Sequence, residues 1–366
     1  MRLIAQLRTA YIYEPHRFKM KALTFRGKHD IRYETKPDPQ LVVPTDVIVK
    51  VNLCAVCGSD LHVYHEHEKG IDHGTAMGHE FMGEVVETGK DVKHLRVGDS
   101  VMSPFSISCG QCFFCKIGLT SRCVQSQLFG WVENGRGLEG AQAEYVRVPL
   151  AEHTLLKIPE GIADEEALLL GDIIPTGYYC AQQAGLEPSG THVVVGCGPV
   201  GLMTILGAIH QGSEKVYAVD TIPERLLMAE KFGAIPVDAS KQNAIELIRE
   251  VTEKRGADAV MEAVGNNATG RLAYELVRPG GIISMVGVCT DQTMPFTPTD
   301  AYNKNLTFKV GRCPARNLFP TLIPIVQAHK YNFTSIITHR LSLKQGAEGY
   351  DIFSNKKDNC LKVVLK

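Results

Sequence analysis

The sequence lacks the features that would point to a membrane or a nucleic acid as partner. No apolar run reaches the roughly 18 uncharged residues that a membrane-spanning helix needs. The 39 lysines and arginines are balanced by 40 aspartates and glutamates, so the formal net charge is -1 and there is no basic surplus for phosphate-rich partners. We therefore expect no membrane partner and no nucleic-acid partner.

Residues 1–19 carry arginines and one acid but no apolar core, so we expect no secretory signal. We expect residues 1–19 to be an N-terminal extension, with an organelle-targeting segment as the alternative. Without an export signal, the 11 cysteines indicate a reducing compartment, where clustered cysteines are more often metal ligands than disulfides. The expected location is the cytoplasm, or the mitochondrion if residues 1–19 are a targeting segment.

The length of 366 residues favours two domains, because single cores usually stop growing at roughly 250 to 300 residues. Short β-type runs broken by turns dominate up to about residue 148, whereas strand-like and helix-like runs alternate from about residue 190. Such alternation predicts a doubly wound parallel sheet. We expect an α/β protein with a β-rich domain of residues 20–173 and 313–366 and a dinucleotide-binding domain of residues 174–312.

A glycine-rich loop begins the second domain. The segment VVVGCGPVG has the G-x-G-x-x-G pattern, directly after an apolar strand and before a helical run. The glycines allow a tight turn, a close approach to a pyrophosphate and close helix packing. The candidate cofactor-binding residues of this loop are Gly196, Gly198, Pro199, Val200 and Gly201.

The next predicted strand, VYAVD, ends in an acid, Asp220. A carboxylate at this position accepts hydrogen bonds from the adenosine ribose and repels a 2′-phosphate, so NAD is favoured over NADP. Arg225 is a candidate neighbour of the ribose or adenine, with a solvated charge on a helix face as the alternative.

Four cysteines lie close together in CGQCFFCKIGLTSRC. Cys109, Cys112, Cys115 and Cys123 can surround one zinc ion tetrahedrally and leave no open position for a substrate. The spacing predicts a structural zinc site.

A second possible metal site is dispersed. Cys57, His79 and Asp172 are suitable ligands for a catalytic zinc, which needs about three protein ligands and an open position. Their spacing alone does not bring them together, and they could also be a core residue, a turn residue and a helix cap. Asp172 is nevertheless unusual, because a charge within the apolar run LLLGDII is costly unless it is paired or bound to a metal.

The motifs CGSD-LH, GHEFMGEV, VGDSV, the four-cysteine cluster, AEYVRVP, D-x3-TGY and VVVGCGPVG occur in this order. Together they resemble the zinc-dependent alcohol dehydrogenases of the medium-chain dehydrogenase/reductase superfamily, over Met20 to Lys366. The resemblance implies a GroES-like β-barrel catalytic domain beside a Rossmann domain. It also implies one catalytic and one structural zinc per chain.

The resemblance assigns Cys57, His79 and Asp172 as ligands of the catalytic zinc. Glu80 matches a glutamate that approaches the metal in some members of the family. Asp60 matches a residue that orients His79.

Further roles follow from the same resemblance. Ser59 and His62 match a proton relay from the bound alcohol to solvent. Thr176 and Lys362 match residues that contact the nicotinamide and the phosphates. Phe105 is a candidate wall of the substrate pocket, with core packing as the alternative. We read His65, His67 and His73 as residues of a solvated loop, and not as ligands.

The implied activity is reversible hydride transfer between an alcohol, expected to be secondary, and NAD. Alternatives are a polyol or L-threonine dehydrogenase and a formaldehyde dehydrogenase or dismutase. A non-catalytic binding protein that retains the fold is a further alternative. The resemblance also implies a homodimer or homotetramer.

Overall fold

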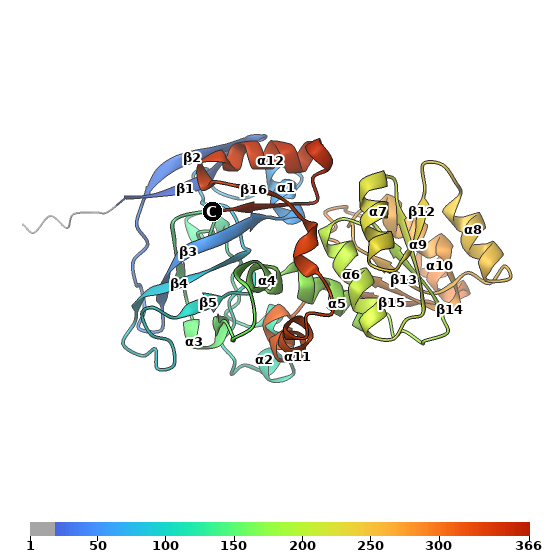
Figure 1. Ribbon diagram of the computed structural model, residues 1–366, viewed down its shortest axis with the longest axis horizontal. Coiled ribbons are helices and arrows are strands. Elements are labelled where there is room, and N and C mark those ends of the chain that lie inside the picture. The colour runs from blue at the N-terminus through green and yellow to red at the C-terminus, as the bar shows by residue number, and fades with distance from the viewer. Residues whose placement is uncertain (1–18) are drawn as a thin grey trace, which may run out of the picture.

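The computed structural model describes residues 19–366, so the expected N-terminal extension lies outside the described residues up to residue 18. Two lobes lie side by side, and each is built around its own sheet (Figure 1). Across the described residues, we find no helix whose length and apolar character would let it cross a membrane.

The first lobe contains a seven-stranded sheet in the order β16-β17-β3-β4-β5-β9, with β8 paired to β3. Two hairpins, β1–β2 and β6–β7, complete it. Its strands are β1 (Lys19–Gly27), β2 (Asp30–Pro37), β3 (Val47–Val56), β4 (Phe81–Thr88), β5 (Ser100–Met102), β6 (Trp131–Glu133), β7 (Arg136–Leu138), β8 (Tyr145–Val148), β9 (Leu156–Lys157), β16 (Ile337–Leu341) and β17 (Lys362–Leu365). Because β17 pairs with β3, the end of the chain returns to the lobe in which it began.

Short helices surround this sheet. They are α1 (Gly58–Tyr64), α2 (Phe113–Lys116), α3 (Ala151–Thr154), α4 (Asp164–Leu170), α11 (Ala315–Gln327) and α12 (Gly346–Asn355), with the 3-10 turns η1 (Thr120–Arg122), η2 (Phe333–Ile336), η3 (Leu343–Gln345) and η4 (Lys357–Asn359). The core beneath α12 contains Leu23, Val49, Phe81, Tyr350 and Val363, which are all fully buried. This packing joins both ends of the described chain to the central strands.

The second lobe is a six-stranded parallel sheet in the order β12-β11-β10-β13-β14-β15. Its strands are β10 (Thr191–Val195), β11 (Lys215–Asp220), β12 (Ile235–Asp238), β13 (Ala257–Glu262), β14 (Val277–Met285) and β15 (Thr307–Val310). Its helices are α5 (Ile173–Gln183), α6 (Pro199–His210), α7 (Pro223–Lys231), α8 (Ala244–Val251), α9 (Asn267–Leu276) and α10 (Pro298–Asn303). The predicted doubly wound sheet is confirmed.

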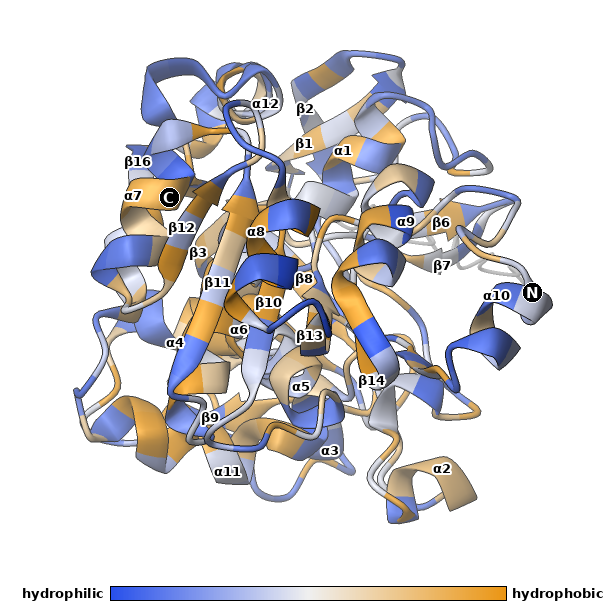
Figure 2. Cartoon of the chain, turned by 90° about the vertical axis from the view of Figure 1, so that its right-hand side faces the viewer, coloured by the Kyte–Doolittle hydropathy of each residue, from blue (hydrophilic) through white to orange (hydrophobic). Residues whose placement is uncertain are grey.

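Burial on both faces explains the composition of these strands. A parallel sheet is covered by helices on each side, so its inner strands are continuously apolar. The residues Val193, Val194 and Val195 of β10 are buried, and β11 is also largely hydrophobic (Figure 2).

The helices α5 and α6 pack closely at the junction of the lobes (Figure 1). Gly177 of α5 makes this approach possible, because a Cβ atom there would lie 2.5 Å from the carbonyl carbon of Met203 in α6. Asp172 immediately precedes α5 as its N-cap residue. The apolar run that surrounds this aspartate is therefore the connection between the two lobes.

Candidate functional site

The loop between β10 and α6 leaves room for a ligand at its glycines. Gly196 has a φ of 88°, and a Cβ atom on it would lie 2.2 Å from Val264. A Cβ atom on Gly201 would lie 1.7 Å from the carbonyl oxygen of Gly196. Beside Gly198 the space is open, with only Arg225 near, at 3.7 Å from the Cβ position. These three positions fit the turn, the packing contact and the phosphate approach of a dinucleotide site.

Pro199 and Val200 follow Gly198 as the first residues of α6. Proline suits this position because its fixed φ is helical and the first N–H of a helix has no partner within the helix. The N–H groups that follow face the loop, and such a helix N-terminus favours a phosphate group.

Asp220 ends β11 next to this loop. Its Oδ2 atom accepts a hydrogen bond from the N–H of Cys197 at 2.7 Å, and its Oδ1 atom accepts one from the N–H of Thr221 at 2.7 Å. The Nη1 atom of Arg225 lies 3.8 Å from Oδ2, and the side chain of Arg225 is only 18% exposed. Arg225 is thus an ion-pair partner of Asp220, which excludes the alternative of a solvated charge on the helix face.

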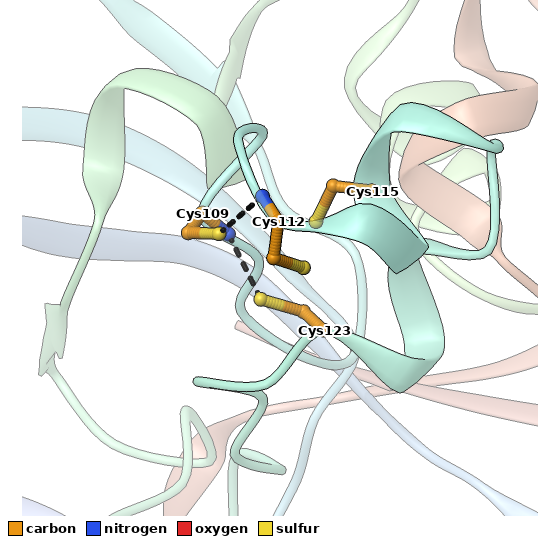
Figure 3. Close-up of side chains that lie close together, drawn as sticks. All are labelled: Cys109, Cys112, Cys115 and Cys123. Carbon is orange, nitrogen blue, oxygen red and sulfur yellow. Dashed lines mark hydrogen bonds between the residues drawn. The ribbon is translucent and has the colours of Figure 1, made fainter.

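The four cysteines of the first cluster meet at one point (Figure 3). The sulfur atoms of Cys109, Cys112, Cys115 and Cys123 lie within 4.8 Å of one another. The N–H of Cys109 donates to the sulfur of Cys123 at 3.2 Å, and the N–H of Cys112 donates to the sulfur of Cys109 at 3.4 Å. Four thiols at this spacing are the donor set of a closed zinc site.

Backbone N–H donors favour the thiolate form of one of these cysteines, Cys112. The N–H groups of Cys115 and Val124 lower the pKa of the Cys112 thiol to about 6. Burial instead raises the pKa of Cys115 to about 12. Zinc binding would displace the proton of that thiol, because the thiolate is the ligand.

The dispersed candidates form a second cluster in the folded chain. The ligand atoms of Cys57, His79, Glu80 and Asp172 lie within 4.8 Å of one another. Cys57 joins β3 to α1, His79 and Glu80 directly precede β4, and Asp172 caps α5. The Oδ2 atom of Asp172 lies 3.5 Å from the sulfur of Cys57 and 3.4 Å from Nε2 of His79. Residues from three parts of the sequence thus converge at the junction of the lobes.

The charges of this cluster depend on one another. Burial raises the pKa of Cys57 to about 11. Burial also opposes charge on His79, but the interactions with Asp60, Cys57 and Asp172 outweigh it and hold the pKa of His79 well above its usual value. Likewise burial disfavours the carboxylate of Asp172, but His79 outweighs it and lowers the pKa of Asp172.

A thiol, an imidazole and carboxylates form the donor set that zinc takes in catalytic sites. Such a buried group of charges is costly unless it is paired or bound to a metal. The residues present therefore fit a zinc ion held by Cys57, His79 and Asp172.

Glu80 and Lys362 form a fully buried ion pair beside the second cluster. The Nζ atom of Lys362 lies 2.6 Å from both carboxylate oxygens of Glu80, and it donates to the carbonyl oxygen of Val56 at 3.1 Å. In this structure Lys362 therefore faces Glu80, and its contact with the cofactor stays a prediction from the resemblance. A buried ammonium needs a carboxylate partner, and Glu80 supplies it.

Asp60 supports His79 from the side away from Asp172. Its Oδ1 atom lies 3.3 Å from Nδ1 of His79, and its Oδ2 atom accepts hydrogen bonds from the N–H of Cys57 at 2.9 Å and from Nε2 of Gln142 at 3.1 Å. The hydroxyl of Tyr350 donates to Oε1 of Gln142 at 2.9 Å. A hydrogen-bonded chain therefore runs from α12 to a candidate metal ligand.

Sequence reasoning missed Gln142 and Tyr350. Gln142 directly precedes the AEYVRVP motif, which is the only signal that could have drawn attention to it. Tyr350 has no such signal, because its role depends on where α12 packs.

The other predicted residues lie near the second cluster. The Oγ atom of Ser59 is 3.3 Å from Nε2 of His79, and the hydroxyl of Thr176 donates to Oδ1 of Asp172 at 3.0 Å. His62 lies one turn beyond Ser59 on α1 and is half-buried. Phe105 is buried in the core cluster that includes Leu168, as core packing requires.

His65 differs from the solvated loop residue that we expected. His67 and His73 are exposed, but His65 is half-buried, and its Nδ1 atom lies 2.7 Å from Nε2 of His29. His65 belongs to no metal-binding group of three or more ligands within residues 19–366.

Two clusters that could each hold a metal ion lie in a chain with a dinucleotide-type parallel sheet, a combination typical of metal-dependent dehydrogenases. Residues 43–160 match the family "Alcohol dehydrogenase GroES-like domain", and residues 199–328 match the family "Zinc-binding dehydrogenase". The chain belongs to the zinc-dependent alcohol dehydrogenases of the medium-chain dehydrogenase/reductase superfamily, and it is an oxidoreductase.

Three similar proteins illustrate this membership. The chain is 40% identical to zinc-type alcohol dehydrogenase B of Aspergillus flavus over 95% of this chain and 81% of that protein. It is 38% identical to the alcohol dehydrogenase TADH from Thermus sp. ATN1, with a TM-score of 0.88 over 94% of this chain and 99% of the other. It is 28% identical to the 2R,3R-butanediol dehydrogenase from Bacillus subtilis, with a TM-score of 0.80 over 95% of this chain and 99% of the other.

Proposed function

We propose that the chain oxidises a secondary alcohol to a ketone with NAD, reversibly, and carries one catalytic and one structural zinc. The second cluster carries this proposal, because the ligand atoms of Cys57, His79 and Asp172 converge at the junction with the dinucleotide-binding lobe. Three protein ligands leave a coordination position for substrate, whereas the four thiols of the first cluster leave none. When bound at the second cluster, zinc supplies Lewis acidity to an alcohol or carbonyl oxygen.

The residues around the second cluster hold its ligands in place. Asp60 orients the ring of His79, and Thr176 donates a hydrogen bond to Asp172. Lys362 neutralises Glu80 and holds it beside the other ligands. In this proposal Glu80 is an additional residue that can coordinate the zinc ion when another ligand leaves it. Partners of this kind fix ligand orientation and raise metal affinity.

Proton transfer is assigned to Ser59 and His62. The hydroxyl of Ser59 lies at the cluster, 3.3 Å from Nε2 of His79, where it can take the proton of an alcohol. Burial, with a smaller contribution from neighbouring His67, lowers the pKa of His62, so its imidazole is neutral at neutral pH and can accept that proton. The rate of alcohol oxidation should therefore fall as the pH is lowered through the pKa of His62.

Asp220 supports NAD as the cofactor. Its carboxylate is fixed at the glycine-rich loop by two backbone N–H groups, and it already pairs with Arg225. A 2′-phosphate would meet the negative charge of Asp220 there. The variant D220S should narrow the preference for NAD over NADP; a wild-type enzyme that prefers NADP would contradict this assignment.

The alcohol itself is identified by a substrate panel. The similarity to a butanediol dehydrogenase supports a secondary alcohol or a vicinal diol. Initial rates with secondary alcohols, polyols, L-threonine and formaldehyde, each with NAD and NADP, should be measured together with the zinc content. Turnover of a secondary alcohol is the expected result. Turnover of none, in protein that holds two zinc ions, would favour a binding protein that retains the fold.

A homodimer or homotetramer is part of the same proposal. The strand β15 lies at the edge of the six-stranded sheet, and an exposed edge strand can pair with another chain. Large apolar side chains are exposed in this part of the chain: Val310 on β15 (64%), Tyr302 on α10 (82%) and Met294, which precedes α10 (58%). Light scattering on the purified enzyme measures the assembly, and a monomer at micromolar concentration would contradict it.

A further inference from the structure

A series of histidine rings leads away from the relay histidine. The ring centroids of His62 and His67 are 6.3 Å apart, those of His67 and His65 are 5.5 Å apart, and those of His65 and His29 are 4.9 Å apart. The first ring is half-buried and the second is exposed. The series therefore connects the candidate relay with the surface.

The backbone after α1 fixes this order of rings. The N–H of His65 donates to the carbonyl oxygen of Leu61 at 2.9 Å. The N–H groups of His67 and Glu68 then both donate to the carbonyl oxygen of His62, at 2.8 and 3.1 Å. The segment consequently folds back over the end of α1, and His67 is held beside the ring of His62.

His65 has no free ring nitrogen with which to carry a proton. Its Nδ1 atom is paired with Nε2 of His29 at 2.7 Å, and its Nε2 atom is paired with Oγ of Ser354 at 3.0 Å. The Ser354 contact ties the loop to α12. His65 therefore holds the loop, and His67 is the exposed imidazole that remains next to His62.

The charged groups around these rings do not offer a better acceptor. Glu68 interacts with Arg312 and His79, on the side of the metal cluster, and burial raises the pKa of its carboxyl group. Glu66 is exposed beside His67. Burial is the main cause that lowers the pKa of His65, and the neighbouring histidines and Lys28 lower it further.

We propose that His67 is a second proton carrier, which takes the proton of alcohol oxidation from His62 and releases it to solvent. The proton leaves a ring nitrogen of the His62 imidazolium and binds a ring nitrogen of neutral His67, directly or over one water molecule. His67 then gives the proton to water or buffer, and no electrons are transferred. His65 is a positioning residue, held by His29 and Ser354. This inference rests on the relay role proposed for His62.

The test compares the full-length zinc-loaded variant H67Q with the control H73Q. His73 is another exposed histidine of the same loop, packed edge-on against Phe25. The maximal rate of alcohol oxidation should be measured from pH 6 to 9, with and without added imidazole. At the low end of this pH range, we expect H67Q to lower kcat by about threefold to tenfold and to leave KM unchanged. This loss is smaller than the rate factor that a typical general acid or base contributes. Imidazole should restore the rate, and H73Q should behave as the wild type.

Two results would overturn the inference. One is an unchanged pH profile in H67Q; the other is a loss of kcat that is equal at every pH and is not restored by imidazole, which is what a merely structural role would produce. The variant H62Q distinguishes a failure of the His62 relay from a failure of the role of His67 alone. If H62Q also keeps the wild-type profile, the relay in the proposed function fails. If H62Q alone loses activity at low pH, only the role of His67 fails.

Discussion

The first cluster takes its four cysteines from one segment, residues 109–123, whereas the second takes its ligands from residues 57, 79, 80 and 172. The first has a single ligand type and lies partly at the surface; the second mixes sulfur, nitrogen and oxygen ligands and is largely buried. A closed site needs only a short loop that can wrap around an ion. A site that must admit a substrate needs a pocket around the metal, and in this fold residues at the junction of the two lobes can form that pocket.

The clusters also differ in what surrounds them. Backbone N–H groups of its own loop support the thiols of the first cluster. The second cluster depends on Asp60 of α1, Gln142 in the segment before β8, Tyr350 of α12 and Lys362 of β17. Loss of the first cluster should therefore lower the stability of the fold, whereas loss of the second should lower the catalytic activity.

The largest effect should come from the second cluster. In C57A, we expect the loss of one zinc per chain and a fall in kcat/KM by a factor of about 1,000 or more, because several kcal/mol of charge stabilisation are lost. The control is C54A, since Cys54 on β3 is another buried cysteine close to Cys57 in the sequence and lies outside both clusters. Metal analysis and initial rates measure both effects. A C57A enzyme that keeps its activity after zinc removal would refute the catalytic assignment.

Loss of the first cluster should mainly reduce stability. In C112S, we expect the loss of the other zinc and a fall in Tm of about 5–10 °C, because a structural metal contributes binding free energy to folding. The control C289S removes an exposed cysteine that belongs to neither cluster. Calorimetry and metal analysis measure the outcome. If C112S unfolded at the wild-type temperature, the contrast between the two clusters would fail.

The supporting residues should give intermediate effects. D60N keeps the shape of the side chain but removes the charge that faces His79, and we expect a fall in zinc affinity at the second cluster of about 10–100-fold. Y350F, which removes only the hydrogen bond to Gln142, should have a smaller effect in the same direction. Competition with a chelator measures the affinity. The first cluster of the same variants is the internal control, and equal weakening of both clusters would point to general destabilisation.

The smallest effect concerns His153, which lies beside the first cluster and pairs with Ser108 at 2.9 Å. Burial and the charge of Arg316 lower its pKa, so the folded protein holds it neutral. The unfolded chain binds a proton from about pH 6.5 downward, so this contribution to stability is present above that pH and is lost as the pH falls below it.

H153Q should reduce the drop in Tm between pH 7 and pH 5 by about one or two degrees. Thermal unfolding at the two pH values measures it. H73Q, which replaces an exposed histidine, should leave the drop unchanged. An identical drop in H153Q and the wild type would show that the titration of His153 does not contribute.

Sequence patterns predicted the local parts of the molecule. The alternation of apolar and helical runs indicated the parallel sheet, and the cysteine spacing indicated the first cluster, because in both the information lies within a few turns of chain. Cys57 and Asp172 could not be paired in this way, since nothing between them encodes their contact. Their assignment as ligands needed the resemblance to the family.

The buried charges show the same limit. A buried Glu80 demands a cation, but the sequence offers 39 lysines and arginines and does not say which one faces it. The pairing with Lys362 follows only from the antiparallel contact of β17 with β3. The support of Asp60 by Gln142 and Tyr350 likewise depends on the position of α12.

The contacts of Tyr350 and Lys362 also set an order of events on the ribosome. The first cluster can close as soon as residue 123 has left the exit tunnel, because all four thiols are then present. The second cluster cannot gain its full set of supports until α12 and β17 have been made. N-terminal parts of a chain generally fold first during synthesis. The nascent protein would thus assemble the four thiols of the first cluster well before the supports of the second cluster are complete.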